Sequence, residues 1–115
     1  MAECIFCKIS QGEIPAKRIY ENSNFFSILD ANPKVEGHSL IISKKHFENV
    51  LDLPSIAGKD FLDCVKNTSI LLMKKYNATG FNLINNNFKS AGQLVGHVHF
   101  HIIPRKEGDN FNSGV

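Results

Sequence analysis

Alternating apolar and polar positions predict five short strands along this chain of 115 residues. Successive side chains of a β-strand point to opposite faces, so alternation with period two indicates a strand with one buried face. The predicted strands span residues 17–21, 25–30, 38–43, 81–85 and 97–103. Asn22-Ser23-Asn24 predicts a hairpin turn between the first two strands, and Pro104 is expected to end the last one.

A different periodicity predicts one long helix over residues 55–76. Apolar residues there recur at helical spacing, which indicates a helix with one buried face. These positions are Phe61, Val65, Leu72 and Tyr76. Asn77 and Gly80 are expected to end the helix, and residues 4–11 predict a short helix or turn near the N-terminus.

This order of elements predicts an α+β fold. Most strands follow one another through short turns, which favours a mainly antiparallel sheet. A sheet this small leaves an edge or a face exposed, and a second copy of the chain could cover it. The polar residues 105–115 are expected to be loose.

Composition narrows the class of protein further. The length fits one domain over residues 1–115, and a hydrophobic fraction of 43% suits an ordinary globular core. Net charge is only +2, with Lys and Arg scattered, so nucleic acid is not an expected partner. No apolar run approaches the ~20 residues of a membrane span and no secretory pattern is present, so we expect a cytoplasmic protein with reduced cysteines.

Three of the five histidines fall on one face of the predicted strand 97–103. Imidazoles at i and i+2 leave the same face and could chelate a transition metal. Alternatively, one imidazole could attack phosphorus while its neighbours stabilise phosphoryl oxygens or protonate the leaving group. A third interpretation is an edge strand that merely exposes three histidines.

The loop before this strand favours chemistry on an anionic phosphate. Gly92 allows backbone N–H groups to approach a ligand closely, and Gln93 adds an amide donor. Asn86 lies just upstream. The same residues would also suit an ordinary polar turn.

At this point the motifs resemble those of the histidine triad (HIT) family of nucleotide-binding proteins, with the HINT-like branch the nearest. Agreement in order and spacing extends along nearly the whole chain. The matching segments are Cys4-Ile-Phe-Cys-Lys-Ile, Gly12-Glu-Ile-Pro-Ala, Tyr20-Glu21, Leu29-Asp30, Pro33, Gly37-His38, Lys44-Lys-His46, Asn82, Asn86, Ala91-Gly-Gln93 and His97-Val98-His99-Phe100-His101-Ile102-Ile103.

The resemblance implies a specific fold and a specific chemistry. Each subunit would have a five-stranded antiparallel sheet, one long helix and a short N-terminal helix, and two subunits would form a homodimer with a continuous ten-stranded sheet. The activity implied is hydrolysis or transfer of nucleoside monophosphates from purine phosphoramidates, aminoacyl adenylates or dinucleoside polyphosphates. Purine nucleotides such as AMP or GMP would be the ligands.

The resemblance also assigns catalytic roles. His99 would be the nucleophile and form a nucleotidyl-histidine intermediate, while its other nitrogen would donate to a backbone carbonyl that fixes the reactive tautomer. His101 would contact the α-phosphate or the bridging atom. His97 and His38 would support the site.

Nucleotide contacts are implied at several further positions. The backbone of Gly92 and the side chain of Gln93 would hold phosphate, and Asp30 would accept from the ribose hydroxyls. The other contact positions are Asn86 and the apolar slot for the base, Phe6, Ile9 and Ile28. Plain core is the alternative for these three apolar residues, and for Ile9 and Ile28 it is an equal one. Leu94 departs from the family pattern, because several members carry a phosphate-binding Ser or Thr there.

Cys4 and Cys7 have the two-residue spacing that can bind one metal ion. A redox pair or two unrelated buried thiols are the alternatives. The resemblance adds His46 and His97 as further ligands, which would make a closed structural zinc site with four ligands. Loss of zinc should then cost stability more than chemistry. Cys64 is expected to be a packed side chain inside the long helix.

Three functions therefore remain to be compared. The leading interpretation is a nucleotidyl hydrolase acting through His99. A nucleotide-binding regulatory or scaffold protein with weak catalysis is the second. A metalloenzyme that uses all three triad histidines as ligands is the third, although Cys4, Cys7 and His46 offer zinc a better site.

Overall fold

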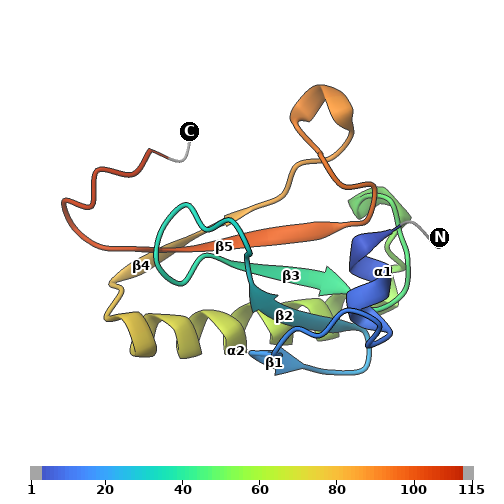
Figure 1. Ribbon diagram of the computed structural model, residues 1–115, viewed down its shortest axis with the longest axis horizontal. Coiled ribbons are helices and arrows are strands. Elements are labelled where there is room, and N and C mark those ends of the chain that lie inside the picture. Colours follow the sequence, from blue (N-terminus) through green and yellow to red (C-terminus); the bar gives the residue numbers. More distant parts are fainter. Residues whose placement is uncertain (1–3, 113–115) are drawn as a thin grey trace.

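The computed structural model describes residues 4–112 and contains one five-stranded antiparallel sheet (Figure 1). The order of strands across the sheet is β1-β2-β3-β5-β4. Their bounds are Tyr20–Glu21 for β1, Phe25–Leu29 for β2, Ser39–Ser43 for β3, Gly80–Ile84 for β4 and His99–Arg105 for β5. The predicted fold class is confirmed, and β4 lies at one edge of the sheet.

Two α-helices flank the sheet: α1 spans Ile5–Ser10 and α2 spans Gly58–Tyr76. The first residues of the predicted long helix form a separate 3-10 turn over Ser55–Ala57. α2 ends at Asn77, which adopts the left-handed conformation with φ 55°, a role that asparagine tolerates. Further 3-10 turns lie at Val50–Asp52 and Lys89–Ala91.

Alternation along the strands divides the core between the two faces of the sheet. Phe25, Ile41 and Phe100 pack with residues of α2 such as Val65. On the other face Phe26 and its neighbours pack with the apolar side chains of α1. This second face is the one that also carries the histidines.

Two expectations about β5 were wrong. The strand begins at His99 and not at His97, because the N–H of Val98 donates to the carbonyl of Phe47 at 2.7 Å and not to a sheet partner. Pro104 does not end the strand, which continues to Arg105 and pairs Pro104 with Phe81. Pairing with β3 stops at Ile102, so Pro104 lies where β5 has a neighbour on one side only and its missing N–H costs little.

The segment after β5, predicted to be loose, makes several hydrogen bonds over the residues that the structure describes. The guanidinium of Arg105 donates to both carboxylate oxygens of Asp109, each at 2.8 Å. Asp109 also accepts from the N–H groups of Lys106 and Phe111, both at 3.1 Å. These bonds fasten a turn, and the rest of the predicted loose segment, residues 113–115, lies outside the described range.

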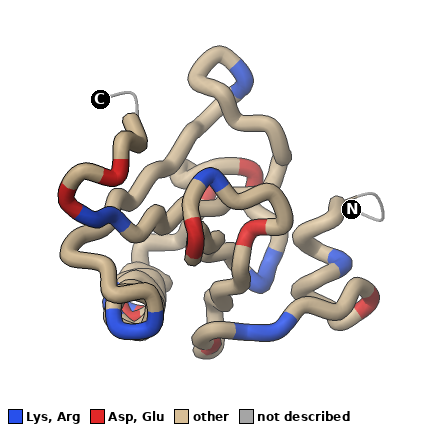
Figure 2. Tube along the Cα trace, turned by 60° about the vertical axis from the view of Figure 1, so that its left-hand side comes forward, with Lys and Arg blue, Asp and Glu red and all other residues tan. Residues whose placement is uncertain are grey.

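Charged residues are dispersed around the trace, with basic and acidic positions interspersed (Figure 2). Among residues 4–112, no helix is long and apolar enough to cross a membrane. Cys64 is fully buried in α2, as expected for a packed side chain.

Candidate functional site

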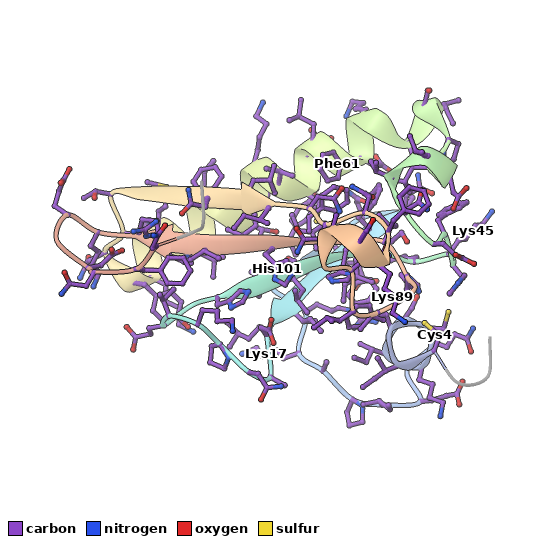
Figure 3. All side chains as sticks on the ribbon, turned by 90° about the horizontal axis from the view of Figure 1, so that it is seen from above. Cys4, Lys17, Lys45, Phe61, Lys89 and His101 are labelled. Atoms are coloured by element: carbon purple, nitrogen blue, oxygen red, sulfur yellow. The ribbon has the colours of Figure 1, made fainter. Side chains whose placement is uncertain are left out.

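The triad histidines alternate with core residues along β5 and the residues leading into it, as the sequence predicted. Figure 3 labels one of them, His101. Val98, Phe100 and Ile102 belong to the core under α2. On the opposite face the ring of Phe6, from α1, contacts the rings of His97 and His99 edge-on, with centroids 5.8 and 5.1 Å away. The histidines therefore line the side of the sheet that α1 partly covers.

His97 lies in a cluster with two cysteines and a second histidine. Its Nδ1 is 3.3 Å from the Sγ of Cys4 and 3.5 Å from the Sγ of Cys7. The Sγ of Cys7 is in turn 3.2 Å from Nδ1 of His46. These four ligand atoms all lie within 4.8 Å of one another. The structure thus brings together the four residues that the sequence predicted as a zinc site.

The donor set of this cluster fits zinc. Tetrahedral zinc takes thiolate and imidazole ligands, and bond lengths of ~2.0–2.3 Å place those ligands roughly 3.3–3.8 Å apart. The Nε2 of His97 donates to the carbonyl of Ser43 at 2.8 Å, so the lone pair of a neutral imidazole is on Nδ1, which faces the cysteines. Burial lowers the pKa of His97 to about 4, which favours this neutral form.

His99 makes the hydrogen bonds that the predicted role of nucleophile would require. Its Nδ1 donates to the carbonyl of His97 at 2.8 Å, so its Nε2 keeps the lone pair. Asn85 donates from Nδ2 to the carbonyl of His99 at 2.9 Å and holds the strand at that point. The rings of His99 and His101 are 5.3 Å apart, which lets both reach one reacting group.

A second polar cluster joins His101 to His38 and Asp30. Nε2 of His38 is 2.9 Å from Nδ1 of His101 and 3.3 Å from a carboxylate oxygen of Asp30. That oxygen is 4.0 Å from Nδ1 of His101. On the other side of the His38 ring, the peptide N–H of Lys34 donates to Nδ1 at 3.0 Å.

The pKa values in this cluster favour neutral rings. Burial is the main reason that the pKa of His38 is lowered. The pKa of His101 is lowered to about 4, first by burial and then by the neighbouring His99 and His38.

Gly37 explains why the backbone can place His38 there. It has φ 87°, and an added Cβ would lie 2.7 Å from Cδ2 of Tyr76 and 3.2 Å from Cγ of Pro104. A left-handed conformation and close packing against α2 both require glycine. The end of α2 therefore sets the position of the loop before β3.

The predicted phosphate loop is internally bonded in this structure. The N–H of Gly92 donates to the carbonyl of Lys89 at 3.0 Å, and that of Gln93 to the carbonyl of Phe88 at 3.1 Å. The Gln93 amide accepts from the N–H of Phe88 at 2.7 Å and donates to the carbonyl of Val95 at 3.0 Å. Binding of phosphate by these groups would require them to exchange those partners.

The remaining predicted contacts lie in two environments. Asn86 lies beside Gly92, with its Nδ2 3.9 Å from the place of a Cβ on that glycine. Phe6, Ile9 and Ile28 are buried together in the apolar cluster on the α1 face. Leu94 is 94% exposed.

Sequence reasoning missed three contributors to the site. Asn85 and the peptide N–H of Lys34 carried no sequence signal, because the first looks like any loop asparagine and the second is backbone. Phe88 was also missed: it has φ 71° and ψ 156°, a region that residues with a Cβ rarely adopt. A phenylalanine gives no hint of such a conformation.

Comparison with known proteins identifies the family. A model of the HIT domain matches residues 11–108. A HIT-like protein of Methanocaldococcus jannaschii, itself uncharacterized, is 50% identical over 106 residues, which are 92% of this chain and 81% of that protein. The adenosine 5'-monophosphoramidase of Candida albicans is 42% identical over 110 residues, which are 92% of this chain and 72% of that enzyme.

The solved structures agree. A Zn-bound histidine triad family protein from Mycobacterium smegmatis is 35% identical and superimposes with a TM-score of 0.89, over 97% of this chain and 81% of that one. The chain belongs to the HIT family, in its HINT-like branch.

Proposed function

We propose that this protein is a nucleotidyl hydrolase that acts through a covalent nucleotidyl-histidine intermediate on His99. The observation that carries the proposal is the hydrogen bond from Nδ1 of His99 to the carbonyl of His97, which leaves Nε2 unprotonated for attack. The relatives supply the enzyme class, because the Candida albicans relative is an adenosine 5'-monophosphoramidase. This chain is accordingly a hydrolase of nucleoside phosphoramidates or phosphoric anhydrides.

The reaction has two displacements at the same phosphorus. Nε2 of His99 attacks the phosphorus and forms the new N–P bond. The bond between phosphorus and the leaving amine, which is protonated at its nitrogen, breaks at the same time. Water then attacks phosphorus, one proton is lost to solvent, and the nucleoside monophosphate leaves neutral His99 behind. His101 would donate a hydrogen bond to an oxygen of the α-phosphate during the first displacement.

The nucleotide would lie across the α1 face of the sheet. Purine nucleotides such as AMP or GMP are the proposed ligands, with the base against Phe6, Ile9 and Ile28 and the ribose at Asp30. Asn86, Gly92 and Gln93 would contact the nucleotide and its phosphate. Leu94 has no hydroxyl to bind phosphate, a contact that several family members make, so a regulatory protein with weak catalysis is the second candidate.

Replacement of His99 tests the catalytic proposal. His99→Asn removes the attacking nitrogen, so turnover of adenosine 5'-phosphoramidate should fall by about 10³-fold or more. AMP binding by calorimetry should persist, since the phosphate and base contacts remain. Lys59→Ala, on the exposed side of α2, is the control and should turn over normally. Full activity in His99→Asn would disprove the nucleophile assignment, and binding without turnover in the unaltered protein would favour the regulatory alternative.

We also propose one structural zinc ion per chain, held by Cys4, Cys7, His46 and His97. When bound, zinc would supply a cross-link between α1, the segment after β3 and the residues that lead into β5. The arrangement of His97 supports this proposal, because the lone pair on its Nδ1 faces both thiols. Free thiols at this cluster suit a cytoplasmic location, which we propose as well.

The chain is proposed to form one HIT domain over residues 1–115 and to act as a homodimer. The edge strand β4 exposes Phe81 and Leu83 at about two-fifths of their surface, 40% and 43%. Ile70 on α2 is also exposed. Pairing of β4 with its copy would complete a ten-stranded sheet and cover these side chains. Sedimentation of Leu83→Lys should give a monomer where the unaltered chain gives a dimer.

A further inference from the structure

The cluster of Asp30, His38 and His101 has the composition of a metal site. One carboxylate oxygen and two imidazole nitrogens lie within 4.8 Å of one another. The three separations are 2.9, 3.3 and 4.0 Å, a range into which a zinc-sized ion would fit after small adjustments. By side-chain chemistry alone, this cluster and the one around His97 would compete for the same ion.

The backbone around His38 argues against metal at this cluster. The peptide N–H of Lys34 points at Nδ1 of His38 from 3.0 Å, and a peptide N–H can only donate. The lone pair of His38 is therefore on Nδ1, and the proton of the neutral ring is on Nε2. A metal would need the lone pair on Nε2, which would force a proton onto Nδ1 against the N–H of Lys34.

The same bond determines the tautomer of His101. Because Nε2 of His38 carries a hydrogen, it donates to Nδ1 of His101 across 2.9 Å. Neutral His101 must then hold its own proton on Nε2. The carboxylate of Asp30, 3.3 Å from Nε2 of His38, favours a proton on that nitrogen as well.

The loop that carries Lys34 is built to hold this geometry. The N–H of Asn32 donates to the side chain of Asp30 at 2.9 Å, and the N–H of His38 donates to the carbonyl of Val35 at 3.1 Å. Gly37 packs against the ring of Tyr76 and leaves no room for a Cβ. Contacts at both ends of the loop thus hold the N–H of Lys34 in its direction toward His38.

We propose that the peptide N–H of Lys34 is a positioning group that sets the tautomers of His38 and His101. It keeps metal out of the Asp30–His38–His101 cluster and makes Nε2 of His101 a hydrogen-bond donor. That this donor acts on the phosphate of a substrate rests on the function proposed above. The tautomers themselves do not depend on it.

The tautomers can be measured directly in the unaltered protein. Long-range ¹H–¹⁵N correlation spectra of ¹⁵N-histidine-labelled protein at pH 7.5 report which ring nitrogen carries the proton. We expect the Nε2–H form at His38 and His101. A proton on Nδ1 of His38 would overturn the proposal, while leaving the assignment of His99 as nucleophile intact.

Two substitutions at one position separate the peptide N–H from the side chain. Lys34→Ala keeps the N–H and removes the ammonium group, whereas Lys34→Pro removes the N–H. Titration with Co²⁺, followed by its visible absorption, should show one more bound equivalent in Lys34→Pro than in the unaltered protein, and no extra equivalent in Lys34→Ala. His38 should lose its preference for the Nε2–H form only in Lys34→Pro.

Turnover gives a third readout. Lys34→Pro should lower kcat by about 10- to 100-fold with little change in KM, as for other groups that orient a functional histidine. Lys34→Ala should retain kcat. The proposal fails if Lys34→Pro keeps both its tautomers and its metal stoichiometry, or if Lys34→Ala changes them. Should Lys34→Pro not fold, the spectra of the unaltered protein still decide.

Discussion

His97 and His101 lie four residues apart on the same face, yet the groups behind them have opposite polarity. The carbonyl of Ser43 accepts a hydrogen bond from Nε2 of His97. The lone pair of the ring is therefore on Nδ1, which faces two cysteines. The N–H of Lys34 donates a hydrogen bond to Nδ1 of His38. The proton of the His38 ring is therefore on Nε2, between His38 and its partner His101. In our proposals, one backbone group in each case separates a metal ligand from a hydrogen-bond donor.

Metal removal should separate the two clusters most strongly. Chelation of purified protein, or Cys7→Ser, should remove about one zinc per chain and lower Tm by at least ~10 °C, because metal binding supplies folding free energy. His38→Asn should leave the zinc content unchanged, since the second cluster holds none. Elemental analysis and calorimetry measure both. Metal-free protein with an unchanged Tm would contradict the proposed difference between a zinc-binding and a metal-free cluster.

The loop behind His38 provides the next largest effect. Gly37→Ala places a Cβ 2.7 Å from the ring of Tyr76 at φ 87°, so we expect a loss of roughly 2–4 kcal/mol in unfolding free energy. Gly12→Ala is the matched control, because Gly12 has φ 82° but nothing within 4 Å of an added Cβ. Its cost should be only ~1 kcal/mol. Urea denaturation measures both, and equal losses would mean that the contact with Tyr76 is unimportant.

Acid should weaken the His101 cluster to a smaller degree. The folded pKa of His101, about 4, lies below the ordinary value of 6.5, so the unfolded chain binds a proton first. Stability from this histidine is present above pH 6.5 and is lost as pH falls toward 4. The loss at pH 5 should be about 1–2 kcal/mol. His101→Gln should flatten that part of the pH profile of Tm, and an unaltered profile would contradict the role of burial.

The smallest effect concerns the loop that leads into His97. Phe88 has φ 71° and ψ 156°, a conformation natural to glycine. Phe88→Gly should therefore raise the free energy of unfolding by up to ~1 kcal/mol, whereas a glycine substitution usually lowers it. Leu94→Gly, in the same loop without a positive φ, should lower stability slightly. Thermal unfolding of the pair measures the strain at Phe88, and a loss in both variants would mean that none is present.

The fold was largely predictable because its signals are local. Alternation placed Phe26 and Ile42 on one face and Phe25 and Ile41 on the other, as the two apolar clusters show. The ends of β5 were not predictable. Val98 leaves the sheet to bond with Phe47, and Pro104 is tolerated because β3 stops short of it. Both reasons concern neighbours distant along the chain.

The candidate site divides in the same way. Side-chain types and spacing brought out Cys4, Cys7 and the three histidines of the triad, and the family motifs added His38 and His46. The sequence by itself therefore determined which strand carries the three histidines, which face of β5 is apolar and which types of metal ligand are available. Only the tertiary structure decided which ring nitrogen of each histidine carries the proton. The carbonyls of Ser43 and His97 and the N–H of Lys34 make that assignment through hydrogen bonds. Every residue has such backbone groups, so their effect depends on where the fold aims them.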